Sequence, residues 1–111
     1  MRPIPLKIRE RLSRDKAMGR CLVCGKSPVQ WHHPLLYSGK QVNKWYSIAP
    51  LCDKCHMGNF GSITPVAKCL SELWCIKRGW EEIHTDLPKF NWNQRKTFLE
   101  NKLKSLWNGI Y

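Results

Sequence analysis

Two Cys-x-x-Cys pairs constrain this chain of 111 residues more than any other feature. Cys21 and Cys24 form the first pair, Cys52 and Cys55 the second, and 27 residues lie between them. Two cysteines three positions apart in a tight turn can direct both thiolates at one ion, and Gly25 tolerates the positive φ that follows such a turn. The sequence therefore predicts a structural Zn²⁺ ion held by four cysteines.

Length and composition predict one small soluble domain. A chain of this size with 42% apolar residues forms a single modest core, and small cores often depend on a structural metal. The N-terminus has no apolar signal region, and no window approaches the roughly 18 apolar residues of a membrane span. We expect a cytoplasmic protein with no membrane partner. In that reducing compartment, paired cysteines indicate metal binding rather than disulfides.

The charge of the chain indicates a polyanionic partner. Nineteen basic and eight acidic side chains give a formal net charge of +11, and residues 1–20 are especially basic. A charge of this size suits nucleic acid, and DNA is the first candidate. The alternative is a solvated surface that only keeps the protein soluble.

Spacing of apolar residues and turn residues predicts helices on both sides of the cysteine region. We expect a basic amphipathic helix over 5–17, and a second helix that begins with Thr64 as N-cap and ends near Gly79. Residues 80–90 are expected to form an acidic, turn-rich connector. A last helix, capped by Asn91 or Asn93, should run to about Trp107.

The last helix carries an apolar stripe that we expect to lie in the core. The stripe consists of Phe98, Leu99, Leu103 and Leu106. If it were exposed, it would indicate a homodimer instead of a monomer. Cys69 and Cys75 on the preceding helix are expected to be thiols without a metal, and His84 is expected to be exposed and without a role.

The order of elements predicts an α+β fold. A zinc knuckle, a β-hairpin and a second ligand pair at the start of a helix are typical of a treble-clef zinc site. The chain then divides into a basic N-terminal helix (1–20), a zinc-stapled core (21–60) and a helical extension (61–111), all within one domain.

The long insert between the cysteine pairs carries two adjacent histidines. A predicted strand over 27–33 ends with His32 and His33, and Pro34 then changes the direction of the chain. Neighbouring residues on a strand point to opposite faces. The two histidines are therefore expected to have different roles.

Two segments carry a family resemblance. Trp31-His32-His33-Pro34 and Ala49-Pro50-Leu51-Cys52-x-x-Cys55-His56, in this order after the first cysteine pair, resemble the zinc-supported HNH, or ββα-metal, endonucleases. The resemblance covers residues 21 to about 60. The stretch Tyr37-Ser38-Gly39-Lys40-Gln41 is also similar to small phage-encoded HNH proteins, which would place the protein in the cytoplasm of a host cell.

The resemblance implies a metal-dependent DNA endonuclease that hydrolyses phosphodiester bonds. His33 takes the place of the general base, while His32 and His56 take the places of the residues that bind a catalytic Mg²⁺, Mn²⁺ or other divalent ion. Ser47 stands where the family has an asparagine that fixes the hairpin loop and orients the base. A serine offers only one hydroxyl for this purpose, and Asn43 is an alternative replacement.

Each of these residues also has a purely structural interpretation. The four cysteines suit a non-catalytic, zinc-dependent nucleic-acid-binding protein equally well, in which His56 is an alternative zinc ligand or a surface residue. A protein-interaction module with the same fold is a third alternative. The nuclease and the binding protein share the charge and the cysteines, and they differ in what His33 does.

Overall fold

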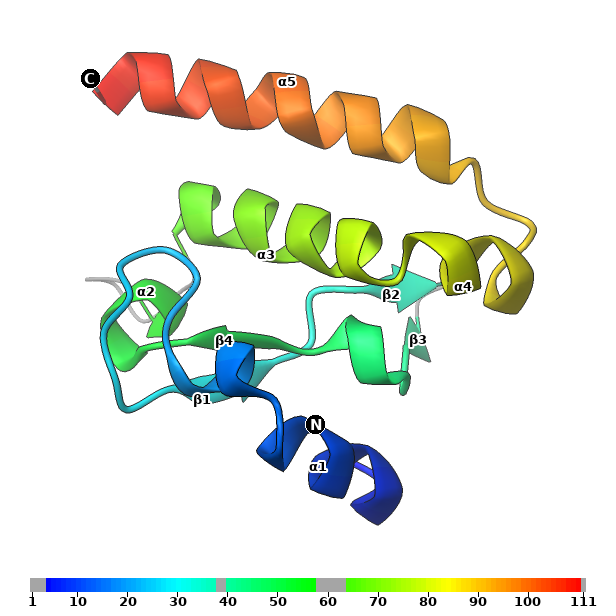
Figure 1. Cartoon of the computed structure of the whole chain (residues 1–111). Helices are drawn as coiled ribbons and strands as arrows, with labels where there is room; N and C mark the ends of the chain where they lie inside the picture. Colours follow the sequence, from blue (N-terminus) through cyan, green and yellow to red (C-terminus); the bar gives the residue numbers. More distant parts are fainter. Residues whose placement is uncertain (1–3, 38–39, 58–63, 111) are drawn as a thin grey trace.

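The computed structural model describes residues 4–37, 40–57 and 64–110 and has an α+β fold (Figure 1). The helices are α1 (Leu6–Ser13), α2 (Asp53–Met57), α3 (Pro65–Arg78), α4 (Trp80–Asp86) and α5 (Trp92–Ile110). The strands are β1 (Gln30–His32), β2 (Leu36–Tyr37), β3 (Lys40–Gln41) and β4 (Ala49–Leu51), and two 3₁₀ helices are η1 (Lys16–Gly19) and η2 (Trp45–Ser47).

The strands form two short antiparallel ladders. β1 pairs with β4, so that Gln30 lies opposite Leu51 and His32 lies opposite Ala49. β2 pairs with β3 inside the insert. The β1–β4 ladder brings the segment after β4 back to the first cysteine pair, and the Leu22 N–H donates to the Pro50 carbonyl at 3.1 Å. This ladder therefore places the two cysteine pairs side by side.

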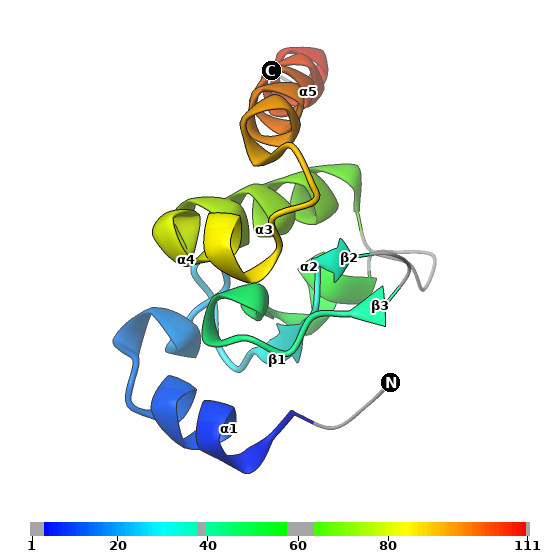
Figure 2. The same ribbon diagram turned by 90° about the vertical axis from the view of Figure 1, so that its right-hand side faces the viewer.

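Helix α3 is the central layer of the molecule. It lies between α5 on one side and the β1–β4 ladder on the other, with α1 on the far side of the ladder (Figures 1 and 2). Its residue Ala67 packs with Leu51 and Cys52 near the cysteine cluster, while the thiol of Cys69 lies 3.2 Å from the Leu99 carbonyl of α5. None of the helices in the described ranges is long and apolar enough to cross a membrane.

The predicted N-caps of the C-terminal helices and the end of α3 are confirmed, whereas α5 continues to Ile110, beyond the predicted end near Trp107. The Thr64 hydroxyl accepts a hydrogen bond from the Ala67 N–H at 3.2 Å, and α3 ends just before Gly79. The Asn91 side-chain oxygen accepts from the Gln94 N–H at 3.0 Å, which makes Asn91 the capping residue of α5. These side chains satisfy backbone donors that the helices themselves leave unpaired.

The N-terminal helix is shorter than predicted. It ends at Ser13, and a 3₁₀ turn follows at 16–19 instead of a continuous helix over 5–17. The reason lies in Asp15, whose carboxylate accepts the Ala17 N–H at 3.0 Å and caps the 3₁₀ turn. Aspartate commonly competes in this way with a continuing helix.

Two predictions for the C-terminal part were wrong. Residues 80–86 form a helix, α4, because the side chain of Ile83 is fully buried in the core and holds this segment against η2 and α3. The other error concerns Phe98, which is 51% exposed, whereas Leu99 and Leu103 are buried as expected. Helical spacing correctly predicted that Leu99 and Leu103 are buried, but it wrongly included Phe98 in the core.

Helix α1 is attached to the rest of the domain by apolar and cationic contacts. Leu12 is buried with Met18 and Ile48. The Arg11 guanidinium lies 4.2 Å from the centre of the Trp45 ring. Asp15 forms an ion pair with Arg78 at the end of α3. The helix is therefore a packed part of the domain.

We expect Gly79→Ala to lower the free energy of unfolding by about 1–3 kcal/mol, the usual cost of overpacking a core. A Cβ at this position would overlap the ring of Tyr46, which is fully buried. The ring is also held by its hydroxyl, which donates to Asp86 at 3.0 Å, so it has little freedom to shift. Denaturant unfolding measures the change.

The matched control is Gly19→Ala, because a Cβ there meets no atom within 4 Å. Its unfolding free energy should stay within about 0.5 kcal/mol of the unmodified protein. Equal effects of the two substitutions would contradict the packing argument.

Candidate metal centre

Four cysteine side chains converge at one point. One sulfur from each of Cys21, Cys24, Cys52 and Cys55 lies within 4.8 Å of all the others, and the Cys24 and Cys52 sulfurs are 3.4 Å apart. Within the described ranges, this is the group of three or more His, Cys, Asp or Glu side chains that could hold a metal ion. The predicted convergence of the two pairs is confirmed.

The cluster has the dimensions of a tetrahedral thiolate site. Zinc–sulfur bonds of about 2.3 Å in a tetrahedron separate the sulfurs by about 3.8 Å, and the distances here bracket that value. The four thiols therefore fit a metal ion such as zinc. Cys21 and Cys52 are buried, whereas Cys24 is exposed, so the site lies at the edge of the domain.

Backbone hydrogen bonds shape both halves of the cluster. In the first pair, the Gly25 N–H donates to the Cys21 carbonyl at 2.9 Å, and Gly25 has a φ of 74°. That dihedral angle favours glycine, as the sequence predicted. In the second pair, the His56 N–H donates to the Cys52 carbonyl at 2.9 Å as α2 begins.

The thiols of the cluster differ in their acidity. Burial raises the pKa of Cys21, but backbone N–H groups of Cys52, Cys24 and Val23 stabilise its thiolate and bring the pKa down to about 6. Burial and the neighbouring sulfurs raise the pKa of Cys55. One thiolate is therefore favoured, and further thiolates need a cation beside them.

The predicted histidine pair lies next to this cluster. His32 is the last residue of β1 and His56 lies in α2, and their ring centres are 5.0 Å apart. Burial, followed by the neighbouring His56 and His33 rings, lowers the pKa of His32 to about 4. The Nδ1 atom of His32 is buried and has no hydrogen-bond partner in the described part of the chain. A bound cation would satisfy such an atom.

Gln30 fixes the orientation of the second imidazole. Its amide nitrogen donates to the Asp53 carboxylate at 2.6 Å, so its amide oxygen faces Nδ1 of His56 at 2.7 Å. Because a carboxylate and an amide oxygen only accept hydrogen bonds, Nδ1 of His56 carries the proton. Its Nε2 atom then holds the lone pair that can bind a metal ion.

His33 directly follows β1. Both ring nitrogens are buried, and neither has a hydrogen-bond partner within residues 4–37, 40–57 and 64–110. Burial lowers the pKa of this histidine from its usual value. An imidazole in this state is neutral at pH 7 and can accept a proton.

Ser47 lies in η2, is fully buried, and uses its hydroxyl within the loop before β4. The oxygen is 2.6 Å from the Val42 carbonyl and 2.7 Å from the Lys44 carbonyl, and it accepts the Lys44 N–H at 3.0 Å. This hydroxyl fixes the loop, and it forms no hydrogen bond with His33. Asn43 lies in the same loop.

The other cysteines and the fourth histidine lie outside the cysteine cluster and the histidine group. Cys69 and Cys75 are both buried in the core formed by α3 and α5, and His84 is exposed, with Nδ1 2.7 Å from the Trp80 carbonyl. Gln30, which contacts His56 and Asp53, was not predicted from the sequence as a site residue. Its position two residues before His32 on the same strand was the available signal, since alternate strand residues share a face.

The chain matches no model of a known protein family, no curated protein and no solved structure.

Proposed function

We propose that this protein is a metal-dependent DNA endonuclease with a ββα-metal core. The observation that carries the proposal is the arrangement of three histidines. The ring centres of His32 and His56 are 5.0 Å apart with the rings tilted by 55°, and Gln30 orients His56. Neither buried ring nitrogen of His33 has a hydrogen-bond partner among the described residues. Such an arrangement suits a divalent ion next to a general base.

The surrounding fold supports the same function. The order of cysteine turn, β1, β4 and α2 is that of a zinc-stapled hairpin followed by a helix, in agreement with the HNH resemblance. In this arrangement a zinc ion at the four cysteines stabilises the fold and takes no part in the reaction. Ser47 contributes by fixing the loop that precedes β4.

In the proposed reaction, the neutral His33 accepts the proton of a water molecule whose oxygen attacks the phosphorus atom. The bond from phosphorus to the 3′ oxygen breaks, and the departing oxygen takes up a proton from solvent. His32 and His56 would hold the divalent ion, which supplies positive charge to stabilise the charge that develops on the phosphate. The Gln30 amide oxygen accepts the proton of His56 Nδ1, which leaves the lone pair on Nε2 available to a cation. Asp53 acts on His56 through Gln30.

Two imidazoles form a soft ligand set for Mg²⁺. Nitrogen ligands suit Mn²⁺, Ni²⁺ or Zn²⁺ better than Mg²⁺, which prefers oxygen. We therefore propose that Mn²⁺ supports the reaction at least as well as Mg²⁺. The net charge of +11 supports DNA as the substrate, because a polyanion is attracted to such a surface.

The test is incubation of the zinc-loaded protein with supercoiled plasmid and either Mn²⁺ or Mg²⁺. We expect nicked and linear products with the added ion and an intact plasmid without it. If the plasmid stays intact in every metal while a gel-shift assay shows binding, the endonuclease proposal fails. The protein would then be a zinc-dependent nucleic-acid-binding module.

We expect Gln30→Ala to weaken binding of Mn²⁺ at the histidine pair by about 10- to 100-fold, the usual cost of removing a residue that orients a metal ligand. Without the amide, the His56 ring can rotate and change its tautomer. Isothermal titration calorimetry on zinc-loaded protein measures this affinity. Gln94→Ala is the control, because this glutamine lies on α5, whereas the two histidines lie on β1 and α2. Equal Mn²⁺ affinity in both variants would contradict the role of Gln30.

A further inference from the structure

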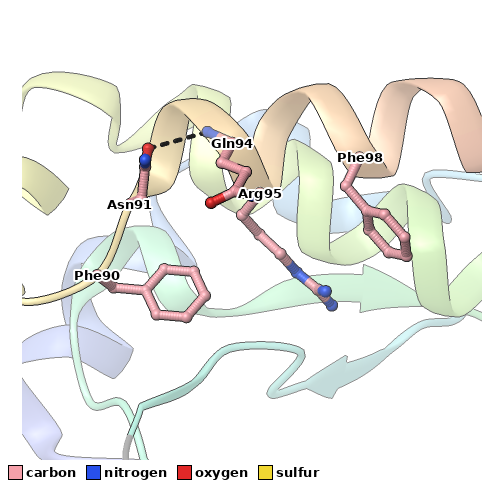
Figure 3. A pocket seen from close by; sticks show the side chains of 5 residues that line it. All are labelled: Phe90, Asn91, Gln94, Arg95 and Phe98. Atoms are coloured by element: carbon pink, nitrogen blue, oxygen red, sulfur yellow. Dashed lines mark hydrogen bonds between the residues drawn. The ribbon is translucent and has the colours of Figure 1, made fainter.

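Two large aromatic side chains remain exposed near the start of α5. Phe90 is 46% exposed and Phe98 is 51% exposed. They line a hollow of 280 Å³ together with Asn91, Gln94 and Arg95. In Figure 3 the Arg95 side chain descends from α5 between the two phenylalanine rings. Neither the proposed reaction nor the core explains why these rings face solvent.

The floor of this hollow is held rigidly. Arg95 donates from Nε and Nη2 to the two carboxylate oxygens of Glu72 on α3, at 2.6 and 2.8 Å. The guanidinium therefore has a fixed plane, and it lies 5.2 Å from the centre of the Phe98 ring. The Phe90 ring is supported by Trp92, with ring centres 4.6 Å apart. Rigid planar groups lose little entropy when a flat ligand stacks on them.

We propose that this hollow binds an unpaired base of single-stranded DNA. Unstacked bases are commonly held on aromatic rings and on arginine guanidinium planes, and both are present here. The Asn91 side-chain oxygen caps α5, but its amide NH2 group and the Gln94 side-chain amide, both lining the hollow, provide hydrogen-bonding groups for a base edge. A volume of 280 Å³ lies just below the usual range for ligand sites, about 300–1,000 Å³, which suits one ring system.

The charge around the hollow favours a nucleic acid over another occupant. The Lys102 ammonium lies 5.9 Å from the centre of the Phe98 ring, and Lys89 is exposed next to Phe90. Neither lysine forms an ion pair within the described part of the chain. A second copy of this protein would bring the same positive charges to the contact, whereas a phosphate backbone would neutralise them.

The site selects single strands for a geometric reason. In a duplex, both faces of each base are covered by the neighbouring bases, so a stacking surface on a protein has no access to them. The inference rests on the proposed action on DNA and adds a substrate class to it, namely DNA with an unpaired segment.

The test is fluorescence anisotropy with a labelled oligothymidylate and zinc-loaded protein, in buffer without Mn²⁺ or Mg²⁺. We expect Phe98→Ala to weaken binding about tenfold, in the range known for loss of one stacked base. Binding to a duplex of equal length should change less than twofold. Phe98→Trp should keep the single-strand affinity, and Leu6→Ala, which removes a residue that is 69% exposed on α1, should leave it unchanged.

Salt dependence and NMR give independent measurements. Lys102→Gln should reduce the slope of log affinity against log salt by about 0.7, the value for one phosphate contact on a single strand. Titration with oligothymidylate should shift the backbone amide signals of Asn91, Gln94 and Phe98. Circular dichroism of Phe98→Ala should show an unchanged melting temperature, because this side chain is exposed.

Several outcomes would overturn the inference. Unchanged single-strand affinity in Phe98→Ala would do so, as would an equal loss for single strands and duplex. A concentration-dependent dimer that disappears in Phe98→Ala, with DNA affinity unchanged, would identify a second copy as the occupant. Plasmid cleavage tests the nuclease proposal separately from this inference. His33→Ala should lose cleavage but bind oligothymidylate with normal affinity. Failure of the nuclease proposal can therefore be distinguished from failure of the single-strand inference.

Discussion

Cys52→Ser is expected to abolish both zinc binding and the cooperative unfolding transition. Binding of a structural zinc ion contributes about 10–16 kcal/mol in small zinc domains, and a domain of this size is stable by only about 5–15 kcal/mol. Loss of one ligand therefore removes free energy comparable to the whole stability. Cys52 also packs with Leu51 and Ala67, so its site connects the β1–β4 ladder to α3.

Differential scanning calorimetry and metal analysis measure this effect. The purified protein should contain one zinc ion per chain, and chelation should have the same consequence as the substitution. Cys69→Ser is the matched control, since its hydroxyl can still donate to the Leu99 carbonyl and the residue lies outside the cluster. A Cys52→Ser variant that keeps its zinc and its melting temperature would contradict a zinc-dependent fold.

His33→Ala is expected to lower the rate of plasmid nicking by about a hundred- to ten-thousand-fold, the usual contribution of a general base. The reason is that alanine cannot accept the proton of the attacking water. Zinc content, Mn²⁺ affinity and DNA affinity should stay close to those of the unmodified protein, because the two ring nitrogens of His33 make no hydrogen bond to the residues that the structure describes.

His84→Ala provides the control for this substitution. That histidine is exposed on α4, and its removal should leave the nicking rate within about twofold. Single-turnover rates with excess protein separate the chemical step from DNA binding. If His33→Ala and His84→Ala nick at the same rate, then His33 does not serve as the base.

The features predicted correctly from the sequence are those that depend on local geometry. The cysteine turn requires a residue that tolerates positive φ, and Gly25 stands there. Thr64 and Asn91 cap helices by accepting hydrogen bonds from residues three positions later. Their roles can therefore be predicted from the local sequence alone. The convergence of the two cysteine pairs followed from their spacing and from the ligand geometry of zinc.

The features that were missed depend on contacts between distant segments. Gln30 gains its role only because strand pairing brings β1 beside α2, which is 23 residues away at Asp53. Segment 80–86 becomes helical because Ile83 is buried against residues far along the chain. Phe98 and Leu99 are adjacent and equally apolar, and only the packing angle of α5 on α3 decides which is buried. Periodicity alone carries no information about that angle.

The attachment of α1 has a thermodynamic consequence. A basic N-terminal segment that is disordered before binding must lose its conformational freedom when it meets DNA, and this cost reduces the affinity. Here Leu12 is buried, and the Asp15–Arg78 ion pair joins the segment to α3 before any partner arrives. The positive charges of α1 are thus already in place, and the DNA binding that we propose would require no folding of this helix.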